Sequence, residues 1–233
     1  MRPEGELLNY DLLIFDWDGT LADSIGRIVE AMRQAADLSG RPVRDDLAIK
    51  GIIGLGLPEA IRTLYPDITG NDLIDFRQHY ADSYMAMDND VPSPLFQGVV
   101  ESIEGFRAEG YKLAVATGKA RRGLNRVLKA HDWLDYFDIT RAADETASKP
   151  DPLMLHEILQ HCGVHPERAL MVGDSSFDLL MARNAGMDSV AVGYGAQTLD
   201  SLREFEPRLA IESFPELRAW LGDRSAQSSL LGY

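Results

Sequence analysis

The sequence predicts an α/β fold in which a parallel sheet is flanked by helices and interrupted once by a helical insertion. Apolar, strand-like runs alternate with segments whose apolar residues recur at helical spacing. Several of these runs end in polar residues, at Asp16, Thr117 and Asp174. Because parallel strands joined by helices bring their carboxyl ends to one edge of the sheet, we expect these polar groups to share one crevice.

The first predicted strand ends in two carboxylates. The apolar run 12–15 leads directly into Asp16 and Asp18, which are followed by Gly19 and Thr20. Buried carboxylates are costly unless they are paired, protonated or bound to a cation, so this pair indicates a divalent-metal site. A simple turn is the alternative, because Asp and Gly favour turns. A calcium loop is excluded, because its template requires a glycine at the sixth position and a glutamate at the twelfth, and both are absent.

The helical insertion follows this strand. Between residues 21 and 96 we find no convincing buried strand, and the spacing of apolar residues predicts helices near 24–38, 58–64 and 72–87. Asp23 or Ser24 is available as the N-cap of the first of these helices.

The alternating pattern resumes after the insertion. Helices are expected over 98–109, 120–131 and 175–184, and strands over 112–116, 136–140, 169–173, 188–192 and, more weakly, 208–211. The helix expected over 120–131 carries four basic residues, Arg121, Arg122, Arg126 and Lys129. These residues could attract an anionic substrate, but we interpret them as a solvated helix face.

Composition limits the partners and the chemistry. The formal charge of −14 is spread along the chain, which argues against a nucleic-acid or anionic-membrane partner. Cys162 is the only cysteine, which excludes an intrachain disulfide, and we interpret it as a buried structural thiol. His161 and His165 are expected at the surface. No apolar run is long enough to cross a bilayer and no signal-peptide core is present, so a cytoplasmic location is expected.

Four short motifs stand beside expected strands, in this order: Asp16-Trp17-Asp18-Gly19-Thr20, Thr117-Gly118-Lys119, Lys149-Pro150 and Gly173-Asp174-Ser175-Ser176-Phe177-Asp178. Together they resemble the motifs of the haloacid dehalogenase superfamily of phosphotransferases, within it the phosphoglycolate-phosphatase-like branch. The resemblance extends over about residues 11–195. It implies a Rossmann-like core over residues 1–20 and 95–223 and an inserted helical cap over residues 21–94. We expect residues 224–233 to form a flexible tail.

The resemblance also implies a reaction, the Mg²⁺-dependent hydrolysis of small phosphorylated metabolites such as phosphoglycolate. Asp16 is then the nucleophile that forms an aspartyl-phosphate, and Asp18 is the general acid/base. The implied metal ligands are the side chains of Asp16 and Asp174 and the backbone carbonyl of Asp18. Asp178 would hold metal-bound water or a lysine. A cation is physically required, because a phosphate and a carboxylate about 4 Å apart repel by roughly 4 kcal/mol at an effective dielectric near 20.

The other two motifs are implied to bind the transferring phosphoryl group. Thr117 and the backbone N–H of Gly118 would hydrogen-bond its oxygens, and Lys149 would neutralise both this group and Asp16. Lys119 either contacts substrate or faces solvent. The glycine-rich segment 51–56 resembles the cap loop that sets specificity, although a plain hinge between helices is an equal alternative. Arg62, Tyr80 and Tyr84 are further candidates for substrate contact.

Other functions remain open at this point. A phosphosugar mutase or a pyrophosphatase of the same superfamily would keep both aspartates. Phosphonate cleavage, which would use Lys50, is disfavoured because Asp18 is present. A non-catalytic binding or regulatory module is disfavoured because none of the catalytic groups is missing. We expect a small phosphorylated metabolite as the partner, and a monomer or homodimer.

Overall fold

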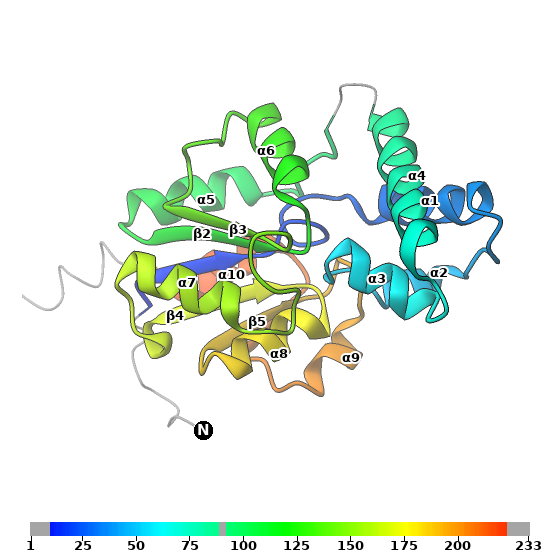
Figure 1. Cartoon of the computed structure of the whole chain (residues 1–233). Helices are drawn as coiled ribbons and strands as arrows, with labels where there is room; N and C mark the ends of the chain where they lie inside the picture. The colour runs from blue at the N-terminus through cyan, green and yellow to red at the C-terminus, as the bar shows by residue number, and fades with distance from the viewer. Residues whose placement is uncertain (1–9, 89–91, 223–233) are drawn as a thin grey trace, which may run out of the picture.

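The computed structural model describes residues 10–88 and 92–222, which form a sheet flanked by helices and a group of helices at one end of it (Figure 1). The predicted tail 224–233 lies outside the described residues. Among the described helices, none has the length and hydropathy that crossing a bilayer requires.

The sheet is parallel throughout, with the strand order β3-β2-β1-β4-β5-β6. Its strands are β1 (Leu12–Phe15), β2 (Lys112–Thr117), β3 (Ile139–Ala142), β4 (Ala169–Gly173), β5 (Asp188–Val192) and β6 (Leu209–Ile211). The chain adds β2 and β3 on one side of β1 and then returns to add β4 on the other side. This reversal of strand order is where open α/β sheets form a crevice at their carboxyl edge. Because β1, β2 and β4 are neighbours there, their terminal residues converge.

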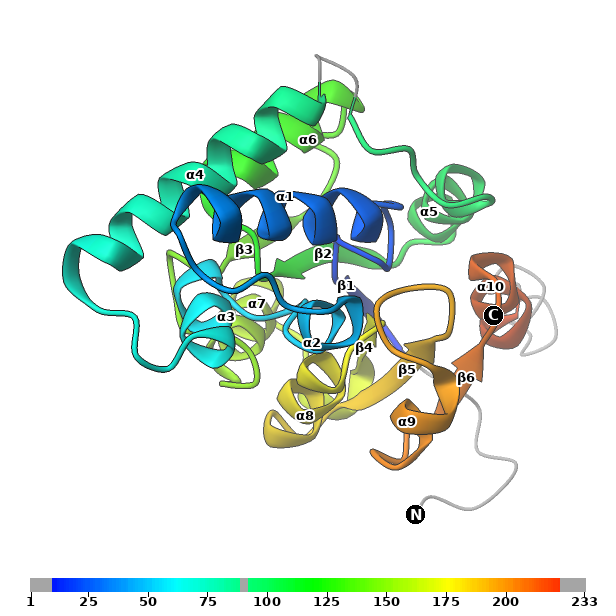
Figure 2. The same cartoon turned by 90° about the vertical axis from the view of Figure 1, so that its right-hand side faces the viewer.

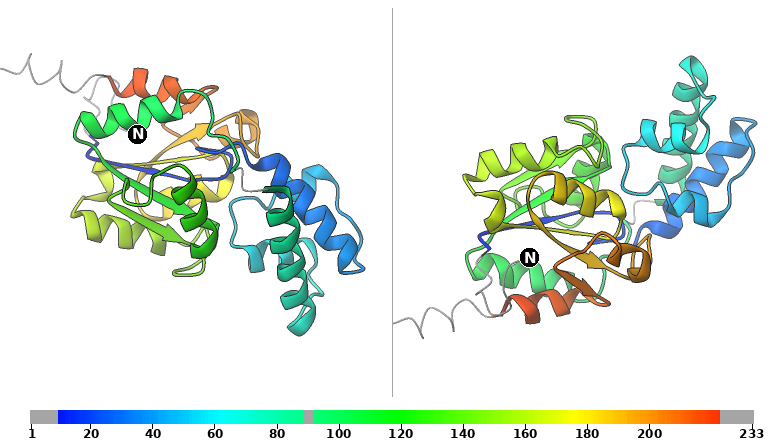
Figure 3. Two further views of the ribbon diagram at one scale, coloured as in Figure 1. Left: turned by 90° about the horizontal axis from the view of Figure 1, so that it is seen from above. Right: turned by 90° about the horizontal axis from the view of Figure 1, so that it is seen from below.

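Two layers of helices bury the sheet on both faces. One face carries α5 (Val99–Ala108), α6 (Arg121–Ala130) and α10 (Phe214–Leu221); the other carries α7 (Leu153–Cys162), α8 (Ser176–Asn184) and α9 (Leu199–Arg203). The right-hand view in Figure 3 shows the sheet between α7 and α8 on one side and α5 and α10 on the other. The side chains of β1 alternate between the two faces of the sheet. Leu13 and Phe15 pack on the side of α5, α6 and α10, while Leu12 and Ile14 pack on the side of α7 and α8.

The inserted segment forms α1 (Ile25–Leu38), α2 (Asp46–Lys50), α3 (Leu57–Leu64) and α4 (Gly70–Asp88). These helices share a hydrophobic cluster of their own, separate from those that cover the sheet. Figure 2 shows them in front of the sheet, with α1 and α4 side by side. The helix α2 has no counterpart among the predicted elements. It is a single short turn, begun by the Asp45 carboxylate, which accepts a hydrogen bond from the backbone N–H of Ala48.

The third strand was predicted too early, over 136–140, whereas it runs over Ile139–Ala142. The aromatic residues that suggested a strand pack instead beside Trp133, with Tyr136 5.5 Å and Phe137 5.8 Å from it between ring centres. The carboxylate of Asp138 accepts a hydrogen bond from the backbone N–H of Leu113 and so aligns the start of β3 with β2.

Two interpretations of single residues are confirmed. Cys162 is a buried free thiol at the end of α7, where it packs in the hydrophobic cluster beneath this helix. His161 and His165 are exposed, as expected.

Candidate active site

The carboxyl ends of β1, β2 and β4 do bring the polar groups of the four motifs together. At the centre is Lys149, whose side chain is fully buried. Its Nζ atom lies 2.8 Å from Oδ1 of Asp16 and 2.6 Å from Oδ1 of Asp178. A buried ammonium needs such partners, because an unpaired charge in a low-dielectric interior is very costly. Burial lowers the pKa of Lys149, but the Asp16 and Asp178 carboxylates more than offset this and raise it, so the residue is charged.

The two partners of this lysine belong to a group of three buried carboxylates. Asp16, Asp174 and Asp178 each place one oxygen within 4.8 Å of the others. Burial raises the pKa of Asp16 to about 7, against the opposing charge of Lys149, and the charge of Asp178 raises it further. Burial also raises the pKa of Asp174 well above its ordinary value, and the charges of Asp16 and Asp178 add to this. If all three were ionised, the cluster would carry more negative charge than Lys149 compensates, which is why protonation is favoured when no cation is bound.

Asp174 is held in one orientation by its neighbours. Its Oδ1 accepts a hydrogen bond of 3.0 Å from the hydroxyl of Thr20, and its Oδ2 accepts one of 2.7 Å from the backbone N–H of Ala196. Gly19 and Gly195 both lie so close to this carboxylate that a Cβ atom at either position would overlap it. Gly19 also has a positive φ of 79°, which other residues adopt at a cost.

Asp178 is the third residue of α8, the helix that follows β4. Its Oδ2 accepts hydrogen bonds from the backbone N–H and the hydroxyl of Ser175, which form a capping box with that residue. Its other oxygen is the one that contacts Lys149. The helix cap thus fixes the carboxylate that holds the lysine beside Asp16.

Asp18 lies in different surroundings from Asp16. Its Oδ1 accepts a hydrogen bond of 2.5 Å from the hydroxyl of Ser24 and lies 2.9 Å from Nζ of Lys119. Ser24 is the N-cap residue of α1, yet its side chain makes no capping bond to the helix, because the hydroxyl is directed to Asp18. Sequence reasoning expected a helix cap here and missed this contact.

Lys119 connects the core to the inserted helices. Its ammonium lies 5.1 Å from the centre of the ring of Tyr84 in α4, within the range of a cation–π interaction. Burial lowers the pKa of Lys119, but Asp18 and the nearby tyrosines outweigh this and raise it, so it is charged. Of the two alternatives stated for Lys119, solvent exposure is wrong, since its side chain is only 12% exposed.

The end of β2 offers groups for a phosphoryl oxygen. Thr117 is fully buried, and its hydroxyl oxygen accepts a hydrogen bond of 3.2 Å from the backbone N–H of Lys119. At Gly118 a Cβ atom would lie 2.5 Å from the carbonyl oxygen of Leu55 and 2.6 Å from that of Gly54. Only glycine lets the loop before α3 come this close to the strand end.

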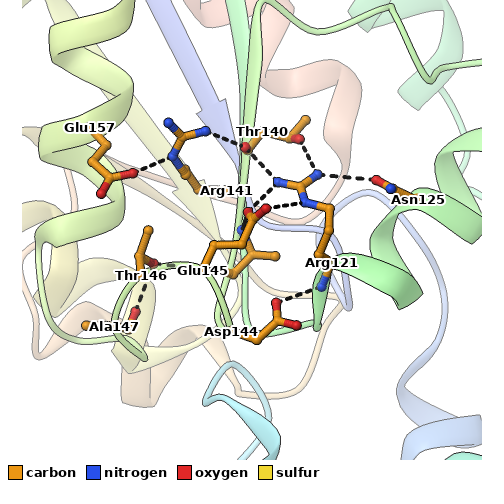
Figure 4. Close-up of polar contacts among 10 residues, drawn as sticks. Arg121, Asn125, Thr140, Arg141, Asp144, Glu145, Thr146, Ala147 and Glu157 are labelled. Atoms are coloured by element: carbon orange, nitrogen blue, oxygen red, sulfur yellow. Dashed lines mark hydrogen bonds and ion pairs between the residues drawn. The ribbon is translucent and has the colours of Figure 1, made fainter.

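The loop that follows β3 and carries Lys149 is attached to the start of α6. Figure 4 shows the guanidinium of Arg121 paired with the carboxylate of Glu145, at 2.8 and 2.6 Å, and bonded to the hydroxyl of Thr140. The backbone N–H of Arg121 donates to Asp144. These contacts join the segment after Thr117 to the segment before Lys149.

The inserted helices cover this cluster and leave a cavity of about 440 Å³ above it. Asp16, Asp18, Thr117 and Gly118 line its core side, and residues of the segment 51–56 line the opposite side. The backbone N–H of Gly56 donates a 2.8 Å hydrogen bond to Ser148, which adjoins Lys149. The glycine-rich segment therefore contacts the strand-end loops directly.

The structure separates the other candidate contact residues. Tyr80 and Tyr84 line the cavity, whereas Arg62 is exposed beside Glu59 and neither it nor Lys50 is among the lining residues. Arg122 and Arg126, interpreted from sequence as a solvated helix face, line the cavity. Arg122 is exposed, so that interpretation holds for it, although it also lines the cavity. It is wrong for Arg126, which is partly buried and lies 5.6 Å from the centre of the Tyr84 ring in α4.

The donor set fits a hard divalent cation. It consists of carboxylate oxygens, which Mg²⁺ prefers. The three carboxylates are buried and close together, and they outnumber the one ammonium group of Lys149. Each of the three carboxylates also has polar partners in the protein: Asp16 pairs with Lys149, Asp174 accepts from Thr20 and Ala196, and Asp178 binds Lys149 and Ser175.

Comparison with known proteins gives a consistent family. A model of the haloacid dehalogenase-like hydrolases matches residues 13–192. The chain is 35% identical to "Probable phosphatase IndB" of Dickeya dadantii, over 88% of this chain and 91% of that protein. It is 29% identical to a phosphoglycolate phosphatase of Nitrosococcus oceani, over 89% of this chain and 95% of that protein. A solved haloacid dehalogenase-like hydrolase from Bacteroides fragilis, 28% identical, matches with a TM-score of 0.80 over 90% of this chain and all of that one.

Proposed function

This chain belongs to the haloacid dehalogenase-like hydrolases, and from that membership and the geometry of its site we propose that it hydrolyses small phosphate monoesters through Asp16. The observation that carries the proposal is the contrast between two aspartates only two positions apart. Asp16 is buried against Lys149 and the acidic cluster, whereas Asp18 faces the cavity beside Ser24 and Lys119. Carboxylates placed in such different surroundings are suited to different roles in one reaction.

The reaction proceeds in two steps. A carboxylate oxygen of Asp16 attacks phosphorus, the ester P–O bond breaks, and Asp18 gives its proton to the departing alkoxide. In the second step Asp18 takes a proton from water, which attacks the phosphorus of the aspartyl-phosphate and regenerates Asp16. The hydroxyl of Thr117 and the backbone N–H of Gly118 hold phosphoryl oxygens, and Lys149 neutralises charge on the transferring group.

Mg²⁺ is the proposed cofactor, with the side chains of Asp16 and Asp174 and the backbone carbonyl of Asp18 as ligands. When bound, it would neutralise the charge on the phosphoryl oxygens and the attacking carboxylate. Asp178 acts indirectly, by holding Lys149. The proximity of the three buried carboxylates and the excess of negative charge support this assignment.

We further propose that residues 21–94 act as a cap over a core formed by residues 1–20 and 95–223. The separate hydrophobic cluster of α1–α4 supports this division. The two segments that connect the cap to the core also lie side by side, which supports the same division: the backbone N–H of Asp23 donates a hydrogen bond to the carbonyl of Pro94. A cap closed over the site would exclude bulk water while the phosphoryl group is transferred from the substrate to Asp16, and would admit the water that hydrolyses the aspartyl-phosphate in the second step.

A trapping experiment tests the role of Asp16. In Asp18→Asn the second step loses its base, while p-nitrophenyl phosphate still reacts in the first step because its leaving group needs no proton. We expect a burst of p-nitrophenolate, followed by borohydride reduction of the trapped acyl phosphate to homoserine at position 16, detected by mass spectrometry. Release of inorganic phosphate by the unaltered protein, without any acceptor, distinguishes a phosphatase from a mutase.

The matched control is Asp16→Asn, which should show neither burst nor homoserine while keeping the circular dichroism spectrum of the unaltered protein. Substantial turnover by Asp16→Asn would show that the nucleophile is assigned wrongly. A protein that hydrolyses neither p-nitrophenyl phosphate nor any metabolite phosphate with Mg²⁺ present would rule out the proposed function.

A further inference from the structure

The cavity above the acidic cluster is larger and less polar than a two-carbon acid needs. Its volume of about 440 Å³ falls within the roughly 300–1,000 Å³ of pockets that enclose drug-sized ligands. Its walls are mostly apolar, formed by side chains of α1, of the segment 51–60 and of α4. Asp16, Asp18 and Thr117 line the base, where the phosphoryl group is expected. The other polar lining residues are Gln78 and Asp82 of α4, Lys119 after β2, and Arg122 and Arg126 of α6.

The aliphatic side of the cavity comes from Ile28 and Met32 of α1 and from Ile52, Ile53 and Leu57. These residues belong to the hydrophobic cluster of the inserted helices or pack against it. An apolar group of a ligand placed here leaves water for a dry surface, which favours binding in proportion to the area buried.

The aromatic side comes from α4. Tyr80 and Tyr84 both line the cavity, with ring centres 6.1 Å apart and ring planes inclined by 36°. Aromatic rings at such spacing present faces and edges against which a further ring can pack. Ala81 lies between them in sequence and also lines the cavity, so it leaves space where a larger residue would fill it.

The cations near the base are already engaged. Lys149 contacts Asp16 and Asp178, and Lys119 contacts Asp18 and lies against Tyr84. Arg122 is exposed, so it stands toward the outside of the cavity. Arg126 also lines the cavity and lies 5.6 Å from the centre of the Tyr84 ring. A carboxylate placed against the aliphatic walls would have no partner there, and burying a charge without a partner is costly.

We propose, on the basis of the phosphatase activity proposed above, that the substrate is a phosphate monoester whose leaving alcohol carries an apolar ring. The phosphoryl group sits over Asp16, and the ring lies between Tyr80 and Tyr84 on one side and the aliphatic residues of α1 on the other. This leaving group is not taken from the names of the relatives: the Dickeya dadantii phosphatase is named without a substrate, and the Nitrosococcus oceani enzyme is named for phosphoglycolate.

The experiment compares 2-phenylethyl phosphate with ethyl phosphate. Both release a primary alcohol, so the reacting bond and its demand for a proton are nearly the same, and the pair differs by the ring. Burial of a phenyl group predicts at least a tenfold higher kcat/KM for 2-phenylethyl phosphate, about 1.4 kcal/mol. We also expect it to exceed phosphoglycolate. Equal values for the two alkyl esters, or a preference for phosphoglycolate, would overturn the inference.

Two variants of α4 locate the preference in the cavity. Ala81→Trp places a large side chain at a lining position next to Tyr80 and should reduce the ratio of the two kcat/KM values toward one. Ala86→Trp makes the same change at an exposed position of the same helix that does not line the cavity, and should leave the ratio unchanged. An unchanged ratio in Ala81→Trp would show that the ring does not bind here.

The outcomes also separate this inference from the function on which it rests. If p-nitrophenyl phosphate is hydrolysed but the ring brings no advantage, only the inference fails. If no phosphate ester is hydrolysed, the phosphatase assignment fails and the inference falls with it.

Discussion

The ammonium of Lys119 lies 2.9 Å from Oδ1 of Asp18, the same oxygen to which Ser24 donates at 2.5 Å. Lys119 follows β2, whereas Ser24 begins the first inserted helix, so groups from both parts of the molecule fix one carboxylate. Tyr84 of α4 lies against the other side of the same ammonium. The position of the inserted helices and the orientation of the proposed acid/base are therefore physically connected.

Replacement of Lys119 should impair catalysis through Asp18. In Lys119→Met the carboxylate loses one of its two partners, and we expect kcat on an alkyl phosphate to fall between about 10- and 100-fold, the cost of misplacing a catalytic group. The loss should be smaller with p-nitrophenyl phosphate, whose leaving group needs no proton. Steady-state kinetics on both esters measure this difference. Lys129→Met, the same change at an exposed position of α6, is the control, and equal losses on the two esters would contradict the role.

The stability of the metal-free protein should depend on pH through Asp16. Burial raises the pKa of this residue from 3.8 to about 7, so between these values the folded state binds more protons than the unfolded state. Its contribution to stability is therefore present at low pH and is lost as the pH rises through about 7. Mg²⁺ binds the deprotonated carboxylates, so it should raise Tm more at pH 8 than at pH 5.5.

Thermal unfolding in EDTA and in Mg²⁺ at these two pH values measures the effect. Asp174→Asn removes a proposed ligand and should abolish most of the Mg²⁺-dependent rise in Tm. A rise of the same size at both pH values, or one that persists in this variant, would count against a cation at the acidic cluster.

A methyl group at Gly118 should obstruct the contact between β2 and the loop before α3. A Cβ atom there would lie 2.5 and 2.6 Å from two backbone carbonyl oxygens, which cannot move aside as a flexible side chain can. We expect Gly118→Ala to lower kcat/KM more than tenfold, since the displaced loop opens the site to water.

The control for this change is Gly26→Ala in α1, where a Cβ atom meets nothing within 4 Å. It should leave activity unchanged and, by improving helix propensity, stabilise the protein by about 0.5–1 kcal/mol. Full activity in Gly118→Ala would mean that the close approach of this loop is not needed for turnover.

The Arg121–Glu145 pair should stabilise the protein at neutral pH. The hydrogen bond from Arg121 lowers the pKa of Glu145 below its ordinary 4.5, so its contribution is present above that value and is lost as the pH falls through the lowered pKa. Glu145→Gln should reduce the urea midpoint at pH 7, and the difference should shrink toward pH 3. Because the pair is partly exposed, the effect is small, and Glu101→Gln, at a surface position of α5, is the control. A difference that grows at low pH would contradict this account.

Much of the fold could be predicted because the apolar periodicity of each core strand is local information. The fifth strand was predicted with its observed bounds, Asp188–Val192, and the first inserted helix within one residue of Ile25–Leu38. The third strand was misplaced because Tyr136 and Phe137 have strong strand propensity but are needed in an aromatic cluster with Trp133. Propensity was overridden there by packing among these neighbouring aromatic residues.

The sequence by itself determined the order of the strands' polar ends, and hence that Asp16, Thr117, Lys149 and Asp174 would meet at one edge, because parallel connectivity leaves few other arrangements. Only the tertiary structure decided what surrounds them. The hydroxyl of Ser24 turns to Asp18 instead of capping its helix, and Arg126 lies in the cavity against Tyr84 instead of in solvent. A hydrophobic pattern predicts which face of a helix is buried. It does not predict which polar residue of a distant segment will contact the opposite face.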